Sequence, residues 1–258
     1  MAEYVQQVDG MGTLRLLEAV RLCSLTHFTR IYQAGSAELF GNTKVSPQNE
    51  STSFHPRSPY GVSKLYSYWT VVNHREAYGM HLSNGIGFNC ESPRRRADFV
   101  SRKITSSVAR IKRGLQNCLE IGNLDAQRDW SHVADFARGI WQMLQQEKGD
   151  DYVLSSGVSR SVREFVTVAF GVVGIVVQWS GLKGSVHEIG VDCANPRRVL
   201  VKVNPTFFRP CEKCELRGNS DKALRLLNWK PSISFGALVK EMVLADLSAI
   251  DCTELDCK

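Results

Sequence analysis

The sequence predicts an α/β protein with a parallel sheet, and three features support this class. Segments with apolar residues at helical spacing alternate with short apolar segments typical of buried strands. The 258 residues are 43% hydrophobic and 22% charged, the balance of a globular protein able to bury a core. Neither an internal repeat nor a low-complexity linker interrupts the alternation. Such alternation is typical of β-α-β units, in which helices connect parallel strands.

The elements can be placed in chain order. Helices are expected at 10–23, 61–78, 99–113, 132–146, 162–173, 221–228 and 235–249. Strands are expected at 28–34, 82–89 and 151–155. A loop rich in Ser, Pro and Asn precedes the helix at 61–78, and the turn Trp229-Lys230-Pro231 separates the last two helices. We interpret Gly10-Met11-Gly12 as a helix start and not as a phosphate-binding turn, because no strand precedes it.

Charge and hydropathy exclude two classes of partner. The net charge is +6, but the basic residues are scattered among acids, and the densest run is Arg94-Arg95-Arg96. A nucleic-acid binder would carry a longer basic stripe or a recognised module, so we expect no nucleic-acid partner. No apolar run reaches the roughly 18 to 20 residues that span a bilayer, and the start MAEYVQQVDG lacks an apolar signal region. We therefore expect a cytoplasmic protein without a membrane partner.

The eight cysteines do not form a disulfide or zinc pattern. Their spacing is irregular, which favours reduced thiols. Cys211 and Cys214 are spaced like half of a zinc knuckle, but no second pair follows at ligand spacing. No metal site is expected.

The most specific chemical signal is the pair Tyr60 and Lys64. Residues four apart lie on one face of a helix. A Lys ammonium near a phenol favours the phenolate, which lowers the pKa of a tyrosine and suits it to general acid/base work. Upstream, Ser36 and Glu38 follow the strand at 28–34, where Ser36 can hydrogen-bond a substrate hydroxyl. Y-x-x-x-K alone is weak, but this combination resembles the short-chain dehydrogenase/reductase superfamily of the extended type.

Further segments narrow the resemblance. They are, in order, residues 33–41 (QAGSAELFG), 57–66 (RSPYGVSKLY), 88–95 (FNCESPRR), 122–130 (GNLDAQRDW), 161–165 (SVREF), 208–212 (FRPCE) and 227–231 (LNWKP). Along nearly the whole chain these segments resemble the GDP-mannose 4,6-dehydratase family. The resemblance implies a partial Rossmann-like parallel sheet plus a smaller C-terminal α/β substrate-binding domain. Residues 1–93 would belong to the NAD(P)-binding domain, and 94–258 mostly to the GDP-sugar-binding region, with some segments returning to the first domain.

The resemblance also implies an activity, an NADP-dependent internal redox dehydration of GDP-mannose to GDP-4-keto-6-deoxymannose in GDP-fucose biosynthesis. Tyr60 would take the proton of the 4-hydroxyl and Glu38 the proton at C5. Ser36 would bind the sugar hydroxyl, and Lys64 would tune Tyr60 and hold the nicotinamide ribose. By position, Tyr4, Cys90 and Arg95 would also contact NADP. Positions implied for the GDP-sugar are Lys103, Arg128, Arg209 and Glu212. The family assembles as homo-oligomers.

The sequence also departs from the family's pattern. Roughly the first hundred residues of the family, including its glycine-rich turn, have no counterpart, so we expect an N-terminally truncated chain with weak NADP binding. Cys90 occupies a position where the family has His, and Arg96 and Asp98 occupy positions where it has Gly and Asn. Lys213-Cys214 replaces a Val-Asp pair of the family. An alternative is a non-catalytic paralogue or splice form that associates with full-length subunits. An epimerase or another nucleotide-sugar dehydratase is a third reading, and Glu38 disfavours an epimerase.

Overall fold

The computed structural model describes residues 2–208 and 215–255, which form two compact units. The first unit comprises residues 1–90, 129–159 and 214–232. The second comprises 91–128, 160–213 and 233–258. Each unit is thus assembled from stretches that are distant in the chain.

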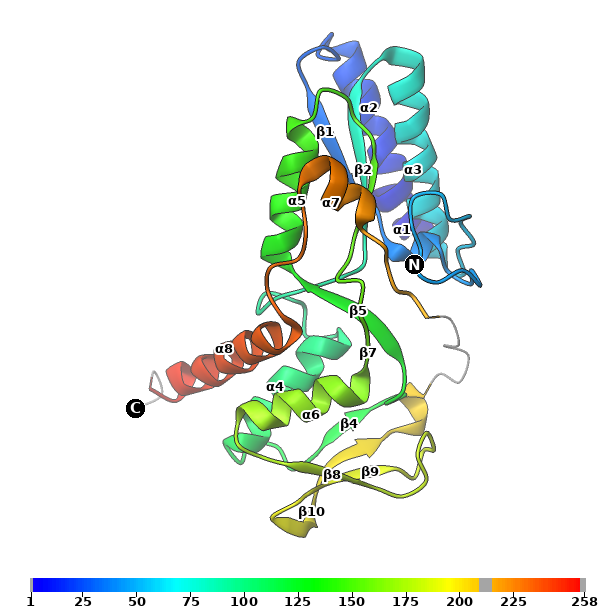
Figure 1. Cartoon of the computed structure of the whole chain (residues 1–258). Helices are drawn as coiled ribbons and strands as arrows, with labels where there is room; N and C mark the ends of the chain where they lie inside the picture. Colours follow the sequence, from blue (N-terminus) through cyan, green and yellow to red (C-terminus); the bar gives the residue numbers. More distant parts are fainter. Residues whose placement is uncertain (1, 209–214, 256–258) are drawn as a thin grey trace. The chain divides into compact units, whose positions relative to one another are not determined.

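The first unit is built on a parallel sheet with helices on both faces, as the alternation predicts. Its strands, in the order β1-β2-β6, are β1 (Arg30–Ala34), β2 (His81–Gly87) and β6 (Asp151–Leu154). Its longer helices are α2 (Met11–Leu22), α3 (Pro59–Tyr78), α5 (Val133–Gln145) and α7 (Asp221–Leu227). Helices α2 and α3 lie on one side of the sheet, and α5 and α7 lie on the other (Figure 1).

Two apolar layers hold these helices to the sheet. Leu82 of β2 packs with Leu17 of α2 and Val71 of α3. Leu154 of β6 packs with Phe136 of α5 in a cluster that also contains the fully buried Trp229. Successive side chains of a strand point to opposite faces, so one short sheet supports both layers.

Asp151, the first residue of β6, forms an ion pair with helix α3. The guanidinium of Arg75, on α3, lies 2.9 Å from the carboxylate of Asp151. That carboxylate also accepts a hydrogen bond of 2.7 Å from the hydroxyl of Tyr68 and one of 2.9 Å from the amide of Asn84. Burial raises the pKa of Asp151, but these hydrogen bonds outweigh it and leave the pKa lowered.

Short helical turns complete this unit. They are α1 (Ala2–Val5), the π-helical η1 (Gln6–Gly10) and the 3₁₀ turn η2 (Ala37–Leu39). Both α1 and η1 pack against α3. Gly10 is the N-cap of α2, so the predicted helix start is confirmed. The turns α1 and η1 themselves were not expected, because they are too short for a periodic pattern.

The second unit packs helices against a mixed sheet. The helices are α4 (Val100–Lys112), α6 (Val162–Val172) and α8 (Phe235–Leu255). The sheet order is β4-β10-β9-β8, with β4 (Leu119–Ile121), β8 (Val177–Ser180), β9 (Ile189–Asp192) and β10 (Asn195–Val203). Strand β10 pairs parallel with β4 and antiparallel with β9. A 3₁₀ turn, η3 (Pro205–Phe207), follows β10.

Short strands carry the chain between the units. These are β3 (Asn89–Glu91), β5 (Gln127–His132) and β7 (Ser159–Ser161), which form a sheet in the order β3-β5-β7. Sequence patterns predicted none of the strands β3, β4, β5 or β7 to β10. Most have only three or four residues, and β5 (QRDWSH) is largely polar although its last four residues are buried.

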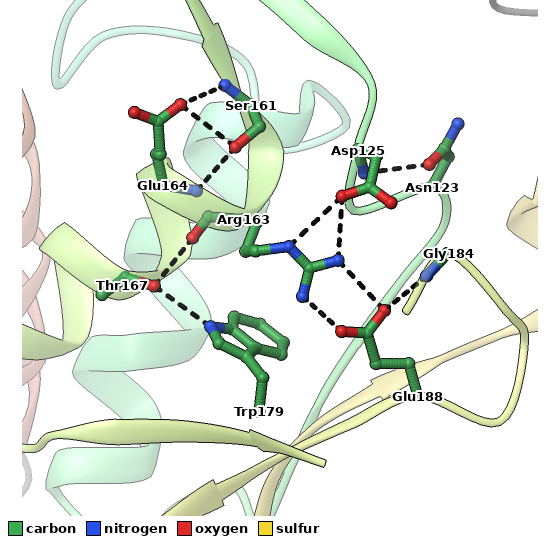
Figure 2. Close-up of polar contacts among 9 residues, drawn as sticks. All are labelled: Asn123, Asp125, Ser161, Arg163, Glu164, Thr167, Trp179, Gly184 and Glu188. Carbon is green, nitrogen blue, oxygen red and sulfur yellow. Dashed lines mark hydrogen bonds and ion pairs between the residues drawn. The ribbon is translucent and has the colours of Figure 1, made fainter. Parts of the chain in front are cut away.

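Arg163 anchors the first turn of α6 in the second unit (Figure 2). Its guanidinium lies 2.9 Å from Asp125 and also pairs with Glu188. Gly184 donates its backbone N–H to the same Glu188 carboxylate over 2.9 Å, and the Arg163 guanidinium lies over the Trp179 ring. The network joins α6 to the loop before β9 by charge-assisted hydrogen bonds.

Helix α6 begins with a capping box. Ser161 accepts from the backbone N–H of Glu164, and the Glu164 carboxylate accepts from the Ser161 N–H over 2.7 Å (Figure 2). This explains why the predicted start near residue 162 is confirmed. Within the described residues, no helix is both long and apolar enough to cross a membrane.

Candidate active site

Ser36 and Glu38 lie immediately after the carboxyl end of β1. The Ser36 hydroxyl accepts the backbone N–H of Glu38 over 3.2 Å and so caps η2. Ser36 is half-buried, whereas the Glu38 side chain is exposed. Ligands of open parallel sheets bind beyond the carboxyl ends of the strands, so this is the edge where a substrate is expected.

Tyr60 and Lys64 occupy the first turns of α3. The Ser58 hydroxyl caps the helix by accepting the Gly61 N–H over 3.0 Å, and Pro59 occupies a first-turn position where its missing N–H costs nothing. The Lys64 ammonium lies 5.5 Å from the centre of the Tyr60 ring. Tyr60 is 38% exposed, which leaves its phenol accessible to a ligand.

Gly61 brings these two segments together. A Cβ at this position would lie 2.9 Å from the carbonyl oxygen of Glu38 and 3.0 Å from Pro56. Glycine therefore permits the first turn of α3 to pack directly on the backbone of η2. As a result, Tyr60 and Glu38 lie on adjoining segments of one unit.

Tyr32 of β1 is a further member of this neighbourhood that sequence reasoning missed. Burial raises its pKa, and electrostatic interactions with Cys90 and Tyr60 raise it further. Both Tyr32 and Cys90 pack at the border of the buried cluster around Trp229. A strand tyrosine usually indicates packing only, so no signal in the sequence distinguished it.

Asp9 of η1 was also missed. Its carboxylate lies 2.9 Å from the Lys64 ammonium. The contact joins residues distant in the chain, so no spacing rule indicated it. Tyr4, which was predicted as a cofactor contact, is 70% exposed on α1.

Three further predicted ligand-binding residues, Arg95, Lys103 and Arg128, lie in the second unit. Arg95 lies 3.3 Å from Glu91, and its guanidinium stacks over Phe99. The Lys103 ammonium lies 4.0 Å from the centre of the Phe207 ring, and burial lowers the pKa of Lys103.

Arg128 donates to the backbone carbonyl of Gln127 over 2.7 Å. Arg209 and Glu212, like Cys211 and Cys214, lie outside the described residues. In the part of the chain that the structure describes, no group of three or more His, Cys, Asp and Glu residues is arranged to hold a metal ion.

Arg96 and Asp98, two departures from the family pattern, contact each other. Their side chains lie 3.0 Å apart and both are exposed. The negative charge of Asp98 is therefore balanced by its neighbour. Such an exposed pair contributes little to stability, about 0 to 1 kcal/mol.

Comparison with solved structures identifies the class of fold. The RMD structure from Pseudomonas aeruginosa, complexed with NADPH, aligns with a TM-score of 0.79 over 95% of this chain and 74% of that one, at 23% identity. The dTDP-glucose 4,6-dehydratase of Bacillus anthracis, in complex with NAD, aligns with a TM-score of 0.76 over 95% and 70%, at 18% identity. The chain has the Rossmann-type α/β fold of these proteins.

Sequence comparison then identifies the family. The profile of the GDP-mannose 4,6 dehydratase family matches residues 1–242. The GDP-mannose 4,6-dehydratase of Sinorhizobium fredii is 51% identical over 95% of this chain, and that of Homo sapiens is 49% identical over 96%. The chain belongs to the GDP-mannose 4,6-dehydratase family. It spans 69% and 66% of the lengths of these two relatives.

Proposed function

We propose that this chain carries the acid/base residues of a GDP-mannose 4,6-dehydratase. The observation that carries the proposal is the placing of Tyr60 and Lys64 on the first turns of α3, with the Glu38 backbone packed against the same helix start. Relatives named GDP-mannose 4,6-dehydratase, at about half identity over most of the chain, support GDP-mannose as the substrate.

In the first half of the reaction, Tyr60 accepts the proton of the mannose 4-hydroxyl as that carbon is oxidised. The Lys64 ammonium stabilises the phenolate that precedes this transfer. Ser36 accepts the Glu38 N–H, so its own O–H remains free to donate to the sugar oxygen. Together the three side chains bind, orient and deprotonate one hydroxyl.

In the second half, Glu38 performs the elimination. A ketone at C4 acidifies the C5 proton, which the exposed Glu38 carboxylate removes before it protonates the departing 6-hydroxyl as water. A simple dehydrogenase needs only the tyrosine as an acid/base, so a second acid/base residue, here Glu38, distinguishes a dehydratase from a dehydrogenase. NADP, when bound, would supply the acceptor for the C4 hydride and its return to C6, and C5 would take up a proton as the hydride returns.

The residues of the first unit fit the nicotinamide end of NADP. Lys64 offers an ammonium with several donors for a ribose, and Tyr60 is accessible beside it. For the pyrophosphate the described residues offer less, because β1 follows the helix α2 and not a strand with a glycine-rich turn. Tyr4, Cys90 and Arg95 are proposed as further cofactor contacts.

We assign contact with the GDP moiety mainly to the second unit. Lys103 is a partly desolvated cation beside an aromatic ring, an environment that strengthens its attraction to a phosphate. Arg128, Arg209 and Glu212 are proposed as the other contacts. An arginine holds a phosphate through paired N–H groups.

The test is conversion of GDP-mannose by the purified chain at high concentration with added NADP, followed by mass spectrometry. We expect a product lighter by one water, and a loss of about 10²-fold or more in Tyr60→Phe. Tyr66→Phe is the matched control, because Tyr66 is on the same helix and 37% exposed against 38% for Tyr60.

Product lost in Tyr60→Phe but kept in Tyr66→Phe would support the proposal. Absence of product at any NADP concentration, or equal losses in both variants, would overturn it. A converted sugar of unchanged mass would indicate an epimerase instead.

A further inference from the structure

The three consecutive arginines Arg94, Arg95 and Arg96 differ in their surroundings. Arg94 and Arg96 are exposed, whereas the side chain of Arg95 is only 26% exposed. One face of the Arg95 guanidinium stacks on Phe99, at 3.5 Å from the centre of the ring, and its Nε atom is buried. Arg95 is therefore the member of this run whose side chain the fold orients.

Glu91 supplies the charge that faces this buried nitrogen. Its Oε2 atom lies 3.3 Å from the Arg95 Nε. Within the described part of the chain, the buried Nε–H has no hydrogen-bond partner, so its contact with the carboxylate is ionic. A buried cationic group without a counter-charge is costly, because it has lost its water. The position of the guanidinium over the Phe99 ring therefore depends on the charge of Glu91.

The Glu91 side chain is itself fixed at the end of β3. It is 2% exposed, and its Oε2 atom accepts a hydrogen bond of 2.6 Å from the hydroxyl of Ser101, in the first turn of α4. Burial raises the pKa of Glu91, and the Ser101 hydrogen bond and the Arg95 charge oppose that shift. The guanidinium thus favours the ionised form of the acid that holds it.

A tight turn sets the spacing between the acid and the arginine. The backbone N–H of Arg95 donates to the Ser92 carbonyl oxygen over 2.9 Å. Pro93 is the second residue of this turn, where its fixed φ is favourable. The Ser92 hydroxyl accepts the Arg94 N–H over 3.1 Å. Glu91 and Arg95 thus lie on either side of one hydrogen-bonded turn.

This arrangement leaves the outer end of the guanidinium available to a ligand. Glu91 faces the Nε atom and Phe99 covers one face, so the two terminal amino groups of Arg95 keep their N–H donors. Among the residues that the structure describes, neither amino group has a hydrogen-bond partner. An arginine holds a phosphate through such paired N–H groups, and one that is already oriented loses less side-chain entropy on binding.

We propose that Glu91 is a positioning residue, which holds Arg95 against Phe99 so that its terminal amino groups meet an anionic group of the cofactor already oriented. The inference rests on the proposed function, because Arg95 is a proposed contact of NADP. Glu91 itself touches neither the cofactor nor the reacting atoms in this role. Its loss should therefore weaken cofactor binding and leave the chemical steps unchanged.

The first measurement needs no bound cofactor. It compares the Arg95 Nε–H signal of Glu91→Gln and the unchanged chain by NMR of protein labelled with ¹⁵N-arginine, the signal being assigned by its absence in Arg95→Lys. Glutamine keeps an oxygen for the Ser101 hydroxyl but carries no charge. We expect exchange of this N–H with solvent to become roughly tenfold faster or more, because the buried nitrogen loses its counter-charge.

The cofactor itself gives the second readout. Added NADP should shift the Arg95 signal of the unchanged chain, and Glu91→Gln should need roughly tenfold more NADP for the same shift. In the turnover assay, Glu91→Gln should raise the KM for NADP by a similar factor and leave kcat within about twofold, because Arg95 contacts no reacting atom in this role.

Asp98→Asn is the matched control, since it removes an acid that contacts an arginine of the same segment, Arg96 at 3.0 Å, and both are exposed. Its Arg95 signal should exchange at the rate of the unchanged chain. Where Glu91→Gln does not fold, Ser101→Ala decides, because it keeps the charge of Glu91 and removes the hydrogen bond that orients it. We expect faster exchange in Ser101→Ala as well.

Equal exchange rates for Glu91→Gln and the unchanged chain, with both folded by thermal melting, would overturn the proposal whether or not the chain turns over. So would an Arg95 signal that NADP does not shift, an equal acceleration in Asp98→Asn, or a fall in kcat at constant KM. Faster exchange and weaker NADP binding in a chain without turnover would uphold the role of Glu91 and reject the proposed function alone.

Discussion

Arg163 and Glu188 form a two-point ion pair in which the glutamate side chain is only 3% exposed. Burial raises the pKa of Glu188, but hydrogen bonds from Arg163 and from the Gly184 N–H outweigh it and lower the pKa below its ordinary value of 4.5. The folded protein therefore favours the ionised carboxylate. The pair acts between α6 and the loop that precedes β9.

Arg163→Ala should destabilise the second unit by about 3 to 5 kcal/mol, because it leaves the Glu188 carboxylate buried without a counter-charge. The matched control is Arg160→Ala, which removes an exposed partner of Glu164 at 3.5 Å and should cost at most about 1 kcal/mol. Urea unfolding of both variants checks the prediction. Comparable losses would refute it.

The same pair predicts an acid dependence. A lowered carboxyl pKa contributes stability above the unfolded value of 4.5, and the contribution is lost as the pH falls through the lowered pKa. Stability against urea should therefore decline below pH 4.5 more steeply in the unchanged chain than in Arg163→Ala. Parallel declines would mean that the pair does not favour the ionised carboxylate.

Asp151→Asn should weaken the first unit, because it leaves the Arg75 guanidinium, 18% exposed, without its acid. We expect the free energy of unfolding to fall by about 2 to 4 kcal/mol at neutral pH. The difference should be smaller in acid, because Asp151 has a lowered pKa and its carboxylate stabilises the fold only at a pH above that pKa. Asp150→Asn is the control, as Asp150 is far more exposed. Thermal unfolding at several pH values distinguishes the two variants.

Glu38→Gln should separate the two halves of the proposed reaction. In heavy water, the product of the unchanged chain should carry deuterium at C5, because the proton that Glu38 removes leaves with the water and C5 then takes up a solvent-derived deuteron. The amide cannot remove that proton, so the variant should lose dehydration by about 10²-fold or more. Retained C5 exchange in Glu38→Gln would show that another group is the base.

NADP should bind this chain weakly, because the described residues offer contacts mainly to the nicotinamide end. Ligand binding stabilises by RT ln(1 + [L]/Kd), so a Kd above 1 mM limits the gain at 1 mM NADP to about 0.4 kcal/mol. A thermal-shift titration measures this directly. Tight, saturable stabilisation would contradict the expectation.

Local signals made much of the first unit predictable. The helix predicted at 61–78 is confirmed as α3, which begins two residues earlier, at Pro59, with Ser58 and Gly79 as its caps. The parallel sheet followed from alternation alone. Tyr60 and Lys64 could be paired from sequence, because a helix fixes the geometry of residues four apart.

Contacts between distant segments could not be predicted in this way. Asp9 meets Lys64 only because η1 folds as a π turn onto α3, which no apolar period encodes. Strand β10 begins with exposed Asn195, Pro196 and Arg197 and contains register shifts, so it shows no clean alternation. Its pairing with β4 and β9 depends on tertiary structure.

The two ends of helix α3 are held by different parts of the first unit. Near its C-terminal end, Arg75 is fixed by Asp151 and thereby tied to the sheet, whereas at its start Lys64 depends on the peripheral turn η1. Small peripheral turns open at far lower free energy than a core helix. Local fraying of η1 would thus release the ammonium while leaving the Tyr60 backbone in place, so we expect the proposed acid/base chemistry to depend on the local stability of a single turn.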